Sequence, residues 1–307
     1  MVPAVPVWNA VCSEAGNCSA AKCPLSGDCF YSKARRGMYL ANILIVNHAL
    51  LMSDLVLRAA EIEMLPEYDM AVIDEAHTLE SVATDHLGIT ASASQVRFLL
   101  TGLFNDRTGR GLLAGLEAPE VIDVVHDAYR HSKGLFDGLR QWLSSRGRSI
   151  GRIDKSKIVQ NTLSPVLLKL GAELRSLTQR VSNPDDKREL LSYAARAETI
   201  AEQMDNLIEQ RMADSVYWLE VEPDRPDRMG VCCAPLEVGP QLSKMLFGAV
   251  RSVVLTSATL AIGRQKDFSY IQGRLGVQTA ETLALGSPFN YEEQVTLHIE
   301  AGLPDPN

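Results

Sequence analysis

Two short apolar runs, each ending in polar residues, constrain the fold of this chain more than any other feature. Met70–Ile73 is followed directly by Asp74-Glu75-Ala76-His77, and Ser252–Leu255 leads into Thr256-Ser257-Ala258-Thr259. Continuous apolar runs of this length are typical of strands that are buried on both faces of a parallel sheet. A third run, Ile43 to Val46, predicts another buried strand. The chain is therefore expected to contain a parallel α/β sheet.

Helical and hairpin patterns fill the rest of the sequence. The patterns predict helices over 30–39 and 50–64, and amphipathic apolar stripes recur at helical spacing from about residue 90 to 212. Strand signals return at 216–221 and 229–233, separated by a turn. The simplest interpretation is one α/β domain that is interrupted by a helical insertion, with a sheet that begins before the insertion and resumes after it.

Composition narrows the class of protein. The 307 residues are 46% hydrophobic and 22% charged, which is ordinary for a globular chain. No apolar run approaches the length of a membrane span, and the N-terminus lacks the pattern of a secretory signal, so a cytoplasmic location is expected. The net charge of −8 argues against a wholly basic nucleic-acid coat protein.

Four cysteines lie close together near the N-terminus. Cys12, Cys18, Cys23 and Cys29 follow the spacing C-x5-C-x4-C-x5-C. In a cytoplasmic chain such a group favours a metal site over disulfides. The spacing lacks the C-x2-C pairs of zinc ribbons, and four thiolates on irregular loops suit an iron–sulfur cluster. Zinc, or a loop that is merely rich in cysteine, remains open. Cys232 and Cys233 lie in an apolar run and are expected to be buried.

The acidic residues after the first strand have the arrangement of a Walker B motif. A parallel strand would carry them to the carboxyl edge of the sheet, where α/β folds bind ligands. Asp74 would hold Mg²⁺ through water, Glu75 would polarise the attacking water, and His77 would sense the state of the nucleotide. The alternative is that Asp74 caps the helix that follows. At the end of the second strand, the small hydroxyl residues of Ser257-Ala258-Thr259 could link a nucleotide site to the movement of a neighbouring domain.

A resemblance to a known family rests on several runs in a fixed order. The chain resembles the iron–sulfur DNA helicases of the DinG/XPD type, and more closely the bacterial DinG branch, in CSAAKCPLSGDCFYSKARR, NILIVNHALLMSDL, YDMAVIDEAHTLE, VYWLEVEP, CCAPLEVG, SVVLTSATLA and SPFNYEEQ. The resemblance covers nearly the whole chain and is looser across the helical insertion. It implies a superfamily 2 helicase that uses ATP to unwind DNA in the 5′ to 3′ direction, in DNA repair or replication.

The resemblance also implies the domain organisation. The fold would be α/β, an incomplete RecA-like parallel-sheet motor domain that is interrupted by an iron–sulfur loop domain and an all-helical arch. The boundaries would be 1–38 for the cluster domain, 39–89 for the DEAH part of motor domain 1, 90–212 for the arch, 213–286 for the return of motor domain 1, and 287–307 for the truncated start of motor domain 2. The DEAH box matches Asp74, Glu75 and His77, and the coupling motif matches Ser257, Ala258 and Thr259. A four-iron–four-sulfur cluster would be held by Cys18, Cys23 and Cys29.

The chain departs from the family pattern in two respects. The first cluster ligand of the DinG branch usually lies well upstream, so the fourth ligand here is either Cys12 or a residue outside this sequence. The chain also contains no G-x-x-x-x-G-K-[ST], the loop that cradles the triphosphate. We therefore expect an internal fragment of a longer helicase, inactive toward ATP on its own. A non-catalytic iron–sulfur DNA-binding or adaptor module is the alternative, and a DEAH-type nuclease or RNA helicase is a second one.

Single-stranded and forked DNA are the expected macromolecular partners, with ATP as the substrate. Lys33, Arg35 and Arg36 follow the cysteines on a basic helix, where they would contact phosphates without reading sequence. The stretch from Arg146 to Lys157 offers a second basic patch. Three aromatic residues follow the cysteines: Phe30, Tyr31 and Tyr39. They could stack on single-stranded bases, but the preferred interpretation is that they are buried in the core of the cluster domain.

Overall fold

The computed structural model describes most of the chain. The described residues are 18, 23–146, 151–222, 225–263, 266–300 and 302, and the side chains of 222 and 225–227 are not included. The expected ligand Cys12 lies outside these residues. Within them, no helix combines the length and the apolar composition that are needed to cross a membrane.

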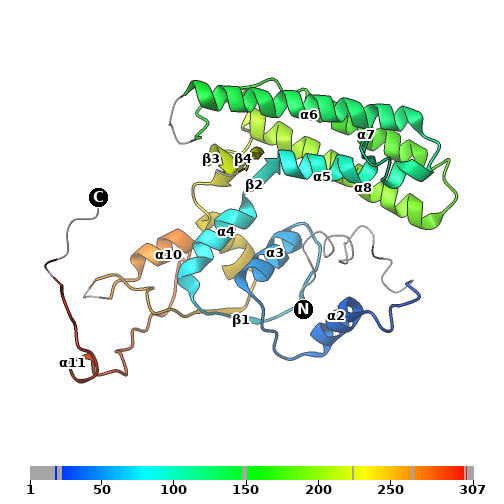
Figure 1. Cartoon of the computed structure of the whole chain (residues 1–307). Coiled ribbons are helices and arrows are strands. Elements are labelled where there is room, and N and C mark those ends of the chain that lie inside the picture. Colours follow the sequence, from blue (N-terminus) through cyan, green and yellow to red (C-terminus); the bar gives the residue numbers. More distant parts are fainter. Residues whose placement is uncertain are drawn as a thin grey trace.

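The elements follow the predicted order closely. The helices are α2 (Phe30–Leu40), α3 (His48–Ala59), α4 (Leu79–Leu87), α5 (Ala93–Leu103), α6 (Pro119–Ser145), α7 (Leu163–Leu177), α8 (Pro184–Glu209), α9 (Gly239–Leu242), α10 (Ser269–Leu275) and α11 (Tyr291–Gln294). The strands are β1 (Met70–Ile73), β2 (Ile89–Ser92), β3 (Ser215–Glu222), β4 (Arg225–Pro235) and β5 (Ser252–Leu255). Figure 1 shows α5–α8 stacked as a bundle on one side, α3, α4 and α10 on the other, and the strands β2–β4 at the junction.

The two sheets differ in direction. Strands β1 and β5 are parallel and in register from Met70 opposite Ser252 to Ile73 opposite Leu255. Their pairing confirms the predicted parallel α/β sheet. The two strands pair although they lie far apart in the sequence. The second sheet is antiparallel, in the order β2-β4-β3, and includes the predicted hairpin. Strand β2 was not predicted; its four residues form a strand by pairing with β4.

Local capping explains where several helices begin. Ser92 and Gln95 form a capping box at α5, with the Ser92 hydroxyl accepting from Gln95 N and the Gln95 side chain accepting from Ser92 N. Asn183 caps α8, which opens with Pro184 as its first residue. Helix α3 ends at Ala59, five residues before the predicted end, because the fully buried Asp54 accepts hydrogen bonds from the N–H groups of Met64 and Leu65.

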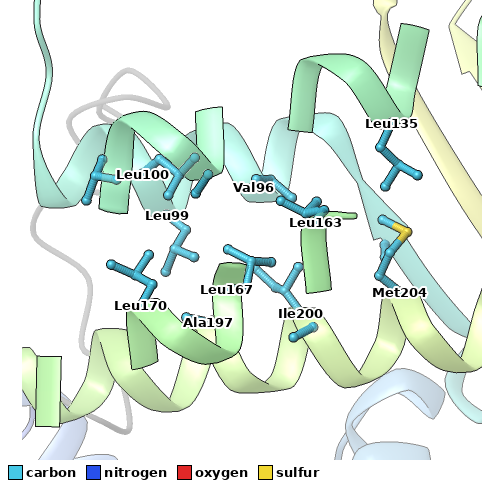
Figure 2. Close-up of a cluster of buried hydrophobic side chains, with 14 of the residues drawn as sticks. Val96, Leu99, Leu100, Leu135, Leu163, Leu167, Leu170, Ala197, Ile200 and Met204 are labelled. Atoms are coloured by element: carbon cyan, nitrogen blue, oxygen red, sulfur yellow. The ribbon is translucent and has the colours of Figure 1, made fainter. Parts of the chain in front are cut away.

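The structure has two hydrophobic cores. The larger core joins α5–α8 to the inner face of the antiparallel sheet, and includes the predicted buried Cys233. Figure 2 shows its centre, where leucines of α7 interdigitate with apolar residues of α5 and α8: Leu163, Leu167, Leu170, Val96, Leu99, Leu100, Ala197, Ile200 and Met204. The smaller core packs α3, α4, α9 and α10 against β1 and β5. The acidic motif after β1 therefore lies at the edge of the smaller core.

The prediction of fully buried parallel strands was wrong on one face. Ile73 is buried, whereas Met70 and Val72 are 62% and 65% exposed. The run from Ile43 to Val46 forms no strand, and Ile45 is 97% exposed. The reason is that, among the described residues, the parallel sheet has only two strands, so these apolar side chains have no partner strand or covering layer.

Candidate functional site

The strand register brings the two predicted motifs together. Because Ile73 is opposite Leu255, the next residues of each strand, Asp74 and Thr256, emerge side by side at the carboxyl edge of the sheet. The Thr256 hydroxyl donates to Asp74 Oδ1 at 2.7 Å. The Ala76 N–H donates to Thr256 O at 3.0 Å, so the two chains remain joined beyond the strands. The alternative that Asp74 caps a helix is wrong, since α4 begins only at Leu79.

Glu75, His77 and Ser257 form a compact polar triangle. The Nδ1 atom of His77 lies 2.8 Å from Ser257 Oγ and 3.3 Å from Glu75 Oε2. The Ser257 hydroxyl reaches Glu75 Oε2 at 3.4 Å. The Thr259 N–H donates to Ser257 Oγ, while Ala258 is exposed and contributes no side-chain hydrogen bond. The carboxylate, the imidazole and the hydroxyl are all accessible, so a ligand at this edge could contact each of them.

The electrostatics of the site favour a charged Asp74. Its hydrogen bond from the Thr256 hydroxyl, followed by the hydrogen bond from the Glu75 N–H, lowers the pKa of the Asp74 carboxyl below its ordinary value. The carboxylate therefore stays ionised at neutral pH. An exposed, ionised carboxylate at a sheet edge is the type of group that holds a hydrated Mg²⁺.

Sequence reasoning missed three residues of this constellation. Thr256 was not assigned a role, although the alignment of the two strand ends could have indicated it. His48 and Thr78 were also missed: Nδ1 of His48 lies 3.0 Å from the Thr78 hydroxyl, which donates to Glu75 O. No spacing in the sequence links His48 to the DEAH box, because the contact depends on how α3 packs beside it.

The described cysteines do not by themselves form a metal site. Cys18, Cys23 and Cys29 are half-buried free thiols, and within the described residues no three His, Cys, Asp or Glu side chains gather as metal ligands would. The N–H and hydroxyl groups of Ser32 lower the pKa of the Cys29 thiol, and the Arg36 charge contributes to the same shift. Cys29 is thus the described thiol with the clearest tendency to ionise, which is what metal ligation requires.

The basic helix α2 carries the predicted phosphate-contacting residues on an open surface, since none of its residues is buried. Lys33 and Arg36 are exposed, with Lys33 3.7 Å from Asp28. Arg35 instead donates to Met64 O and lies over the Tyr39 ring, so it also attaches the helix to the loop before β1. The expectation that the nearby aromatics form a core was wrong: Phe30 is 88% exposed, and Tyr31 and Tyr39 are also exposed.

Fold and site together define an α/β protein in which acidic and hydroxyl residues from two parallel strands meet at one sheet edge. No family model matches the chain. It is 28% identical over 303 residues to the ATP-dependent DNA helicase YoaA of Escherichia coli, covering 98% of this chain and 45% of that protein. It is 31% identical over 312 residues to the ATP-dependent helicase DinG of Mycobacterium tuberculosis, covering 97% and 43%.

A solved XPD helicase structure superposes with a TM-score of 0.45 at 15% identity, covering 83% of this chain and 38% of that one. The sequence similarity to the DinG and YoaA helicases extends over almost all of this chain. It confirms the resemblance to the DinG/XPD-type helicases that the motifs indicated. The chain spans less than half the length of these curated relatives.

Proposed function

We propose that this chain is the part of a DinG-type, ATP-dependent DNA helicase that carries out hydrolysis and couples it to movement along DNA. The observation that carries the proposal is the constellation at the sheet edge, where Asp74 meets Thr256, and Glu75 and His77 meet Ser257. The similarity to ATP-dependent helicases over nearly the whole chain supports the same function.

The proposed roles follow from the chemistry of phosphoryl transfer. That reaction needs a divalent cation near the terminal phosphates and a group that orients the attacking water. Asp74, which accepts the Thr256 hydroxyl, would hold the hydrated Mg²⁺, and the exposed Glu75 carboxylate would orient the water. His77 contacts both Glu75 and Ser257, so a change at the nucleotide would reach the strand end that bears Ser257-Ala258-Thr259. This contact would be a direct route from hydrolysis to movement on single-stranded DNA, in the 5′ to 3′ direction that the family resemblance implies.

The motor needs more than these 307 residues contain. The sequence has no G-x-x-x-x-G-K-[ST], so nothing in it corresponds to the loop that cradles the triphosphate. The exposed apolar face of β1 and the exposed Ile45 have the character of surfaces that the covering helices of a larger RecA-like sheet would bury. We therefore infer that the chain alone does not hydrolyse ATP at a useful rate.

A four-iron–four-sulfur cluster is the proposed cofactor of the N-terminal segment. The proposal rests on the spacing of the cysteines, on the lowered pKa of Cys29 and on the family resemblance, since the described thiols do not gather into a site. Cys18, Cys23 and Cys29 would be three ligands, with Cys12 or a residue of a longer polypeptide as the fourth. Iron and acid-labile sulfide analysis of the chain purified without oxygen distinguishes the cluster from zinc.

Helix α2 and the neighbouring aromatics form the proposed surface for DNA. Lys33 and Arg36 provide exposed positive charge, and the exposed rings of Phe30 and Tyr31 are available to stack on unpaired bases. A surface that combines phosphate contacts with stacking suits single-stranded DNA, and therefore the single-stranded arm of a fork.

Binding of the chain to labelled single-stranded DNA, followed by fluorescence anisotropy across a range of salt concentrations, tests this proposal. Lys33→Gln and Arg36→Gln should each weaken binding and reduce the slope of log K against log salt by about 0.7, the contribution of one phosphate contact on a single strand. Lys169→Gln, on an exposed position of α7, is the matched control and should leave the slope unchanged. Equal slopes for all the variants would remove α2 from the DNA surface. DNA binding that persists when the chain is completed by a phosphate-binding loop, without any ATP hydrolysis, would favour the adaptor module.

A further inference from the structure

The backbone of the DEAH segment adopts an unfavourable conformation at Glu75. Its φ of 48° and ψ of 41° place it in the left-handed region, which residues with a Cβ atom rarely occupy outside glycine-like turns. A residue remains in this region only when the surrounding contacts hold it there. Because the side chain of Glu75 points to the strand-end triangle from this backbone, the contacts that fix the backbone also fix the carboxylate.

The contacts on the Glu75 peptide come mainly from Thr78. Both the N–H and the hydroxyl of Thr78 donate to Glu75 O, each at 3.0 Å. On the other side, the Glu75 N–H donates to Asp74 Oδ1 at 3.0 Å. Thr78 is half-buried, and its hydroxyl and N–H together give the turned carbonyl two donors.

His48 completes this arrangement from a different element. Its Nδ1 atom lies 3.0 Å from the Thr78 hydroxyl oxygen. With its single hydroxyl proton donated to Glu75 O, the Thr78 oxygen can accept from His48, and this geometry suits a tautomer of His48 with the proton on Nδ1. His48 is the first residue of α3, a helix that is capped by Asn47 and anchored in the smaller core through Leu51 and Met52. The imidazole is thus held by a rigid element.

We propose that His48 is a positioning residue for the DEAH box. Through its Nδ1–H it fixes the rotamer of the Thr78 hydroxyl, which in turn holds Glu75 in the left-handed conformation and its carboxylate against Ser257. What Glu75 does when it is so placed rests on the proposed function, but the positioning itself is a property of this chain. It also gives the start of α3 a direct structural connection to the residue that is expected to orient the attacking water.

Two substitutions at His48 distinguish a hydrogen bond from Nδ1 from any other role of the imidazole ring. The side-chain amide nitrogen of asparagine is bonded to Cγ, as Nδ1 is, whereas the amide of glutamine extends to the region of Nε2. His48→Asn should therefore keep the donor to Thr78, and His48→Gln should lose it. At the other partner, Thr78→Ser keeps the hydroxyl, and Thr78→Val removes it with little change of shape.

Nuclear magnetic resonance of the 307-residue chain provides the readouts. In the unsubstituted protein, ¹⁵N shifts of the His48 ring should show that Nδ1 is protonated. The Glu75 backbone ¹³C shifts, and slow exchange of the Thr78 amide proton, should be preserved in His48→Asn and Thr78→Ser. In His48→Gln and Thr78→Val the Glu75 shifts should move toward ordinary values, and the Thr78 amide should exchange at least tenfold faster. His131→Asn, on α6 away from this site, is the matched control and should change none of these signals.

Two results would overturn the proposal. These are a His48 ring with a deprotonated Nδ1, or asparagine and glutamine variants that behave alike. Exchange in α4 and α10, which pack in the same core as the site, reports whether a variant has simply lost its fold, and the ring measurement requires no variant at all. If the positioning signals behave as expected but the completed protein neither hydrolyses ATP nor responds to DNA, the helicase function fails while the role of His48 stands.

Discussion

Replacing Asp54 should strongly destabilise the smaller core, which carries the DEAH segment, although Asp54 is not part of the site itself. Asp54 is fully buried and accepts hydrogen bonds from Arg58 Nε at 2.6 Å, from the Leu65 N–H at 2.7 Å and from the Met64 N–H at 3.2 Å. Through these contacts it fastens α3 to the loop that enters β1. The Asp54→Ala variant leaves the guanidinium and two N–H groups without this acceptor.

The magnitude follows from the burial of the two partners. Removing one member of a buried ion pair typically costs about 3–5 kcal/mol, because the other charge is left uncompensated. The side chain of Arg58 is 25% exposed, so water offsets part of this loss and the lower end, about 3 kcal/mol, is expected. Asp54→Asn keeps an acceptor for the Leu65 N–H but presents its neutral amide N–H group to Arg58, and its loss should be smaller, about 1–2 kcal/mol.

Hydrogen exchange resolved along the chain is the appropriate assay, because the two cores need not unfold together. A loss of about 3 kcal/mol corresponds to exchange roughly a hundredfold faster in α4 and β1, since about 1.4 kcal/mol is a factor of ten. Exchange in α7, which belongs to the other core, should hardly change. Asp28→Asn removes the acid of an exposed ion pair and is the matched control, with an expected effect below about 0.5 kcal/mol. A loss below about 1 kcal/mol for Asp54→Ala, or equal acceleration in α4 and α7, would refute this reasoning.

Three further predictions concern packing and thiol chemistry. Gly276→Ala should lower the free energy of unfolding of the smaller core by about 2–4 kcal/mol in urea titrations, because its Cβ would lie 2.1 Å from Gly239 O at a φ of +73°. Gly263→Ala, at a φ of +70° but in open space, should cost only about 1 kcal/mol. Leu167→Ala, in the fully buried centre of the bundle, should cost about 2–5 kcal/mol and accelerate exchange in α7 but not in α4. In the metal-free chain at pH 7, iodoacetamide should modify Cys29 well before Cys232. The lowered pKa of Cys29 raises its thiolate fraction, whereas burial raises the pKa of Cys232 to about 11. Equal rates of modification, measured by mass spectrometry, would contradict this assignment.

The sequence was most informative where periodicity and local chemistry act together. The apolar runs at 70–73 and 252–255 predicted two parallel strands, and their pairing in register explains why Asp74 and Thr256 meet. The long amphipathic stripes predicted the helices of the bundle for the same reason, since the 3.6-residue period directly reflects which face is buried.

Other features depend on contacts between distant segments and could not be predicted. An apolar run forms a buried strand only when a neighbouring strand is present, which is why Ile43–Val46 did not become one among the described residues. The end of α3 depends on Asp54 binding a loop ten residues further on. The left-handed Glu75 depends on Thr78 and His48, and no local pattern marks such a strained residue. The exposure of the aromatic side chains of α2 could not be predicted either, because hydrophobicity alone does not distinguish a buried ring from an exposed one.

The most direct test of the central claim is DNA-stimulated ATP hydrolysis by a polypeptide that joins this chain, in its natural frame, to a segment containing a G-x-x-x-x-G-K-[ST] loop. We expect the joined protein to hydrolyse ATP and single-stranded DNA to stimulate it. Glu75→Gln should abolish turnover but retain nucleotide binding, and Ser257→Ala should weaken the stimulation by DNA more than the basal rate. The 307-residue chain alone should show no turnover. Robust hydrolysis by the chain alone, or full activity of the joined Glu75→Gln protein, would contradict the assignment of this sheet edge as the hydrolytic site of a helicase.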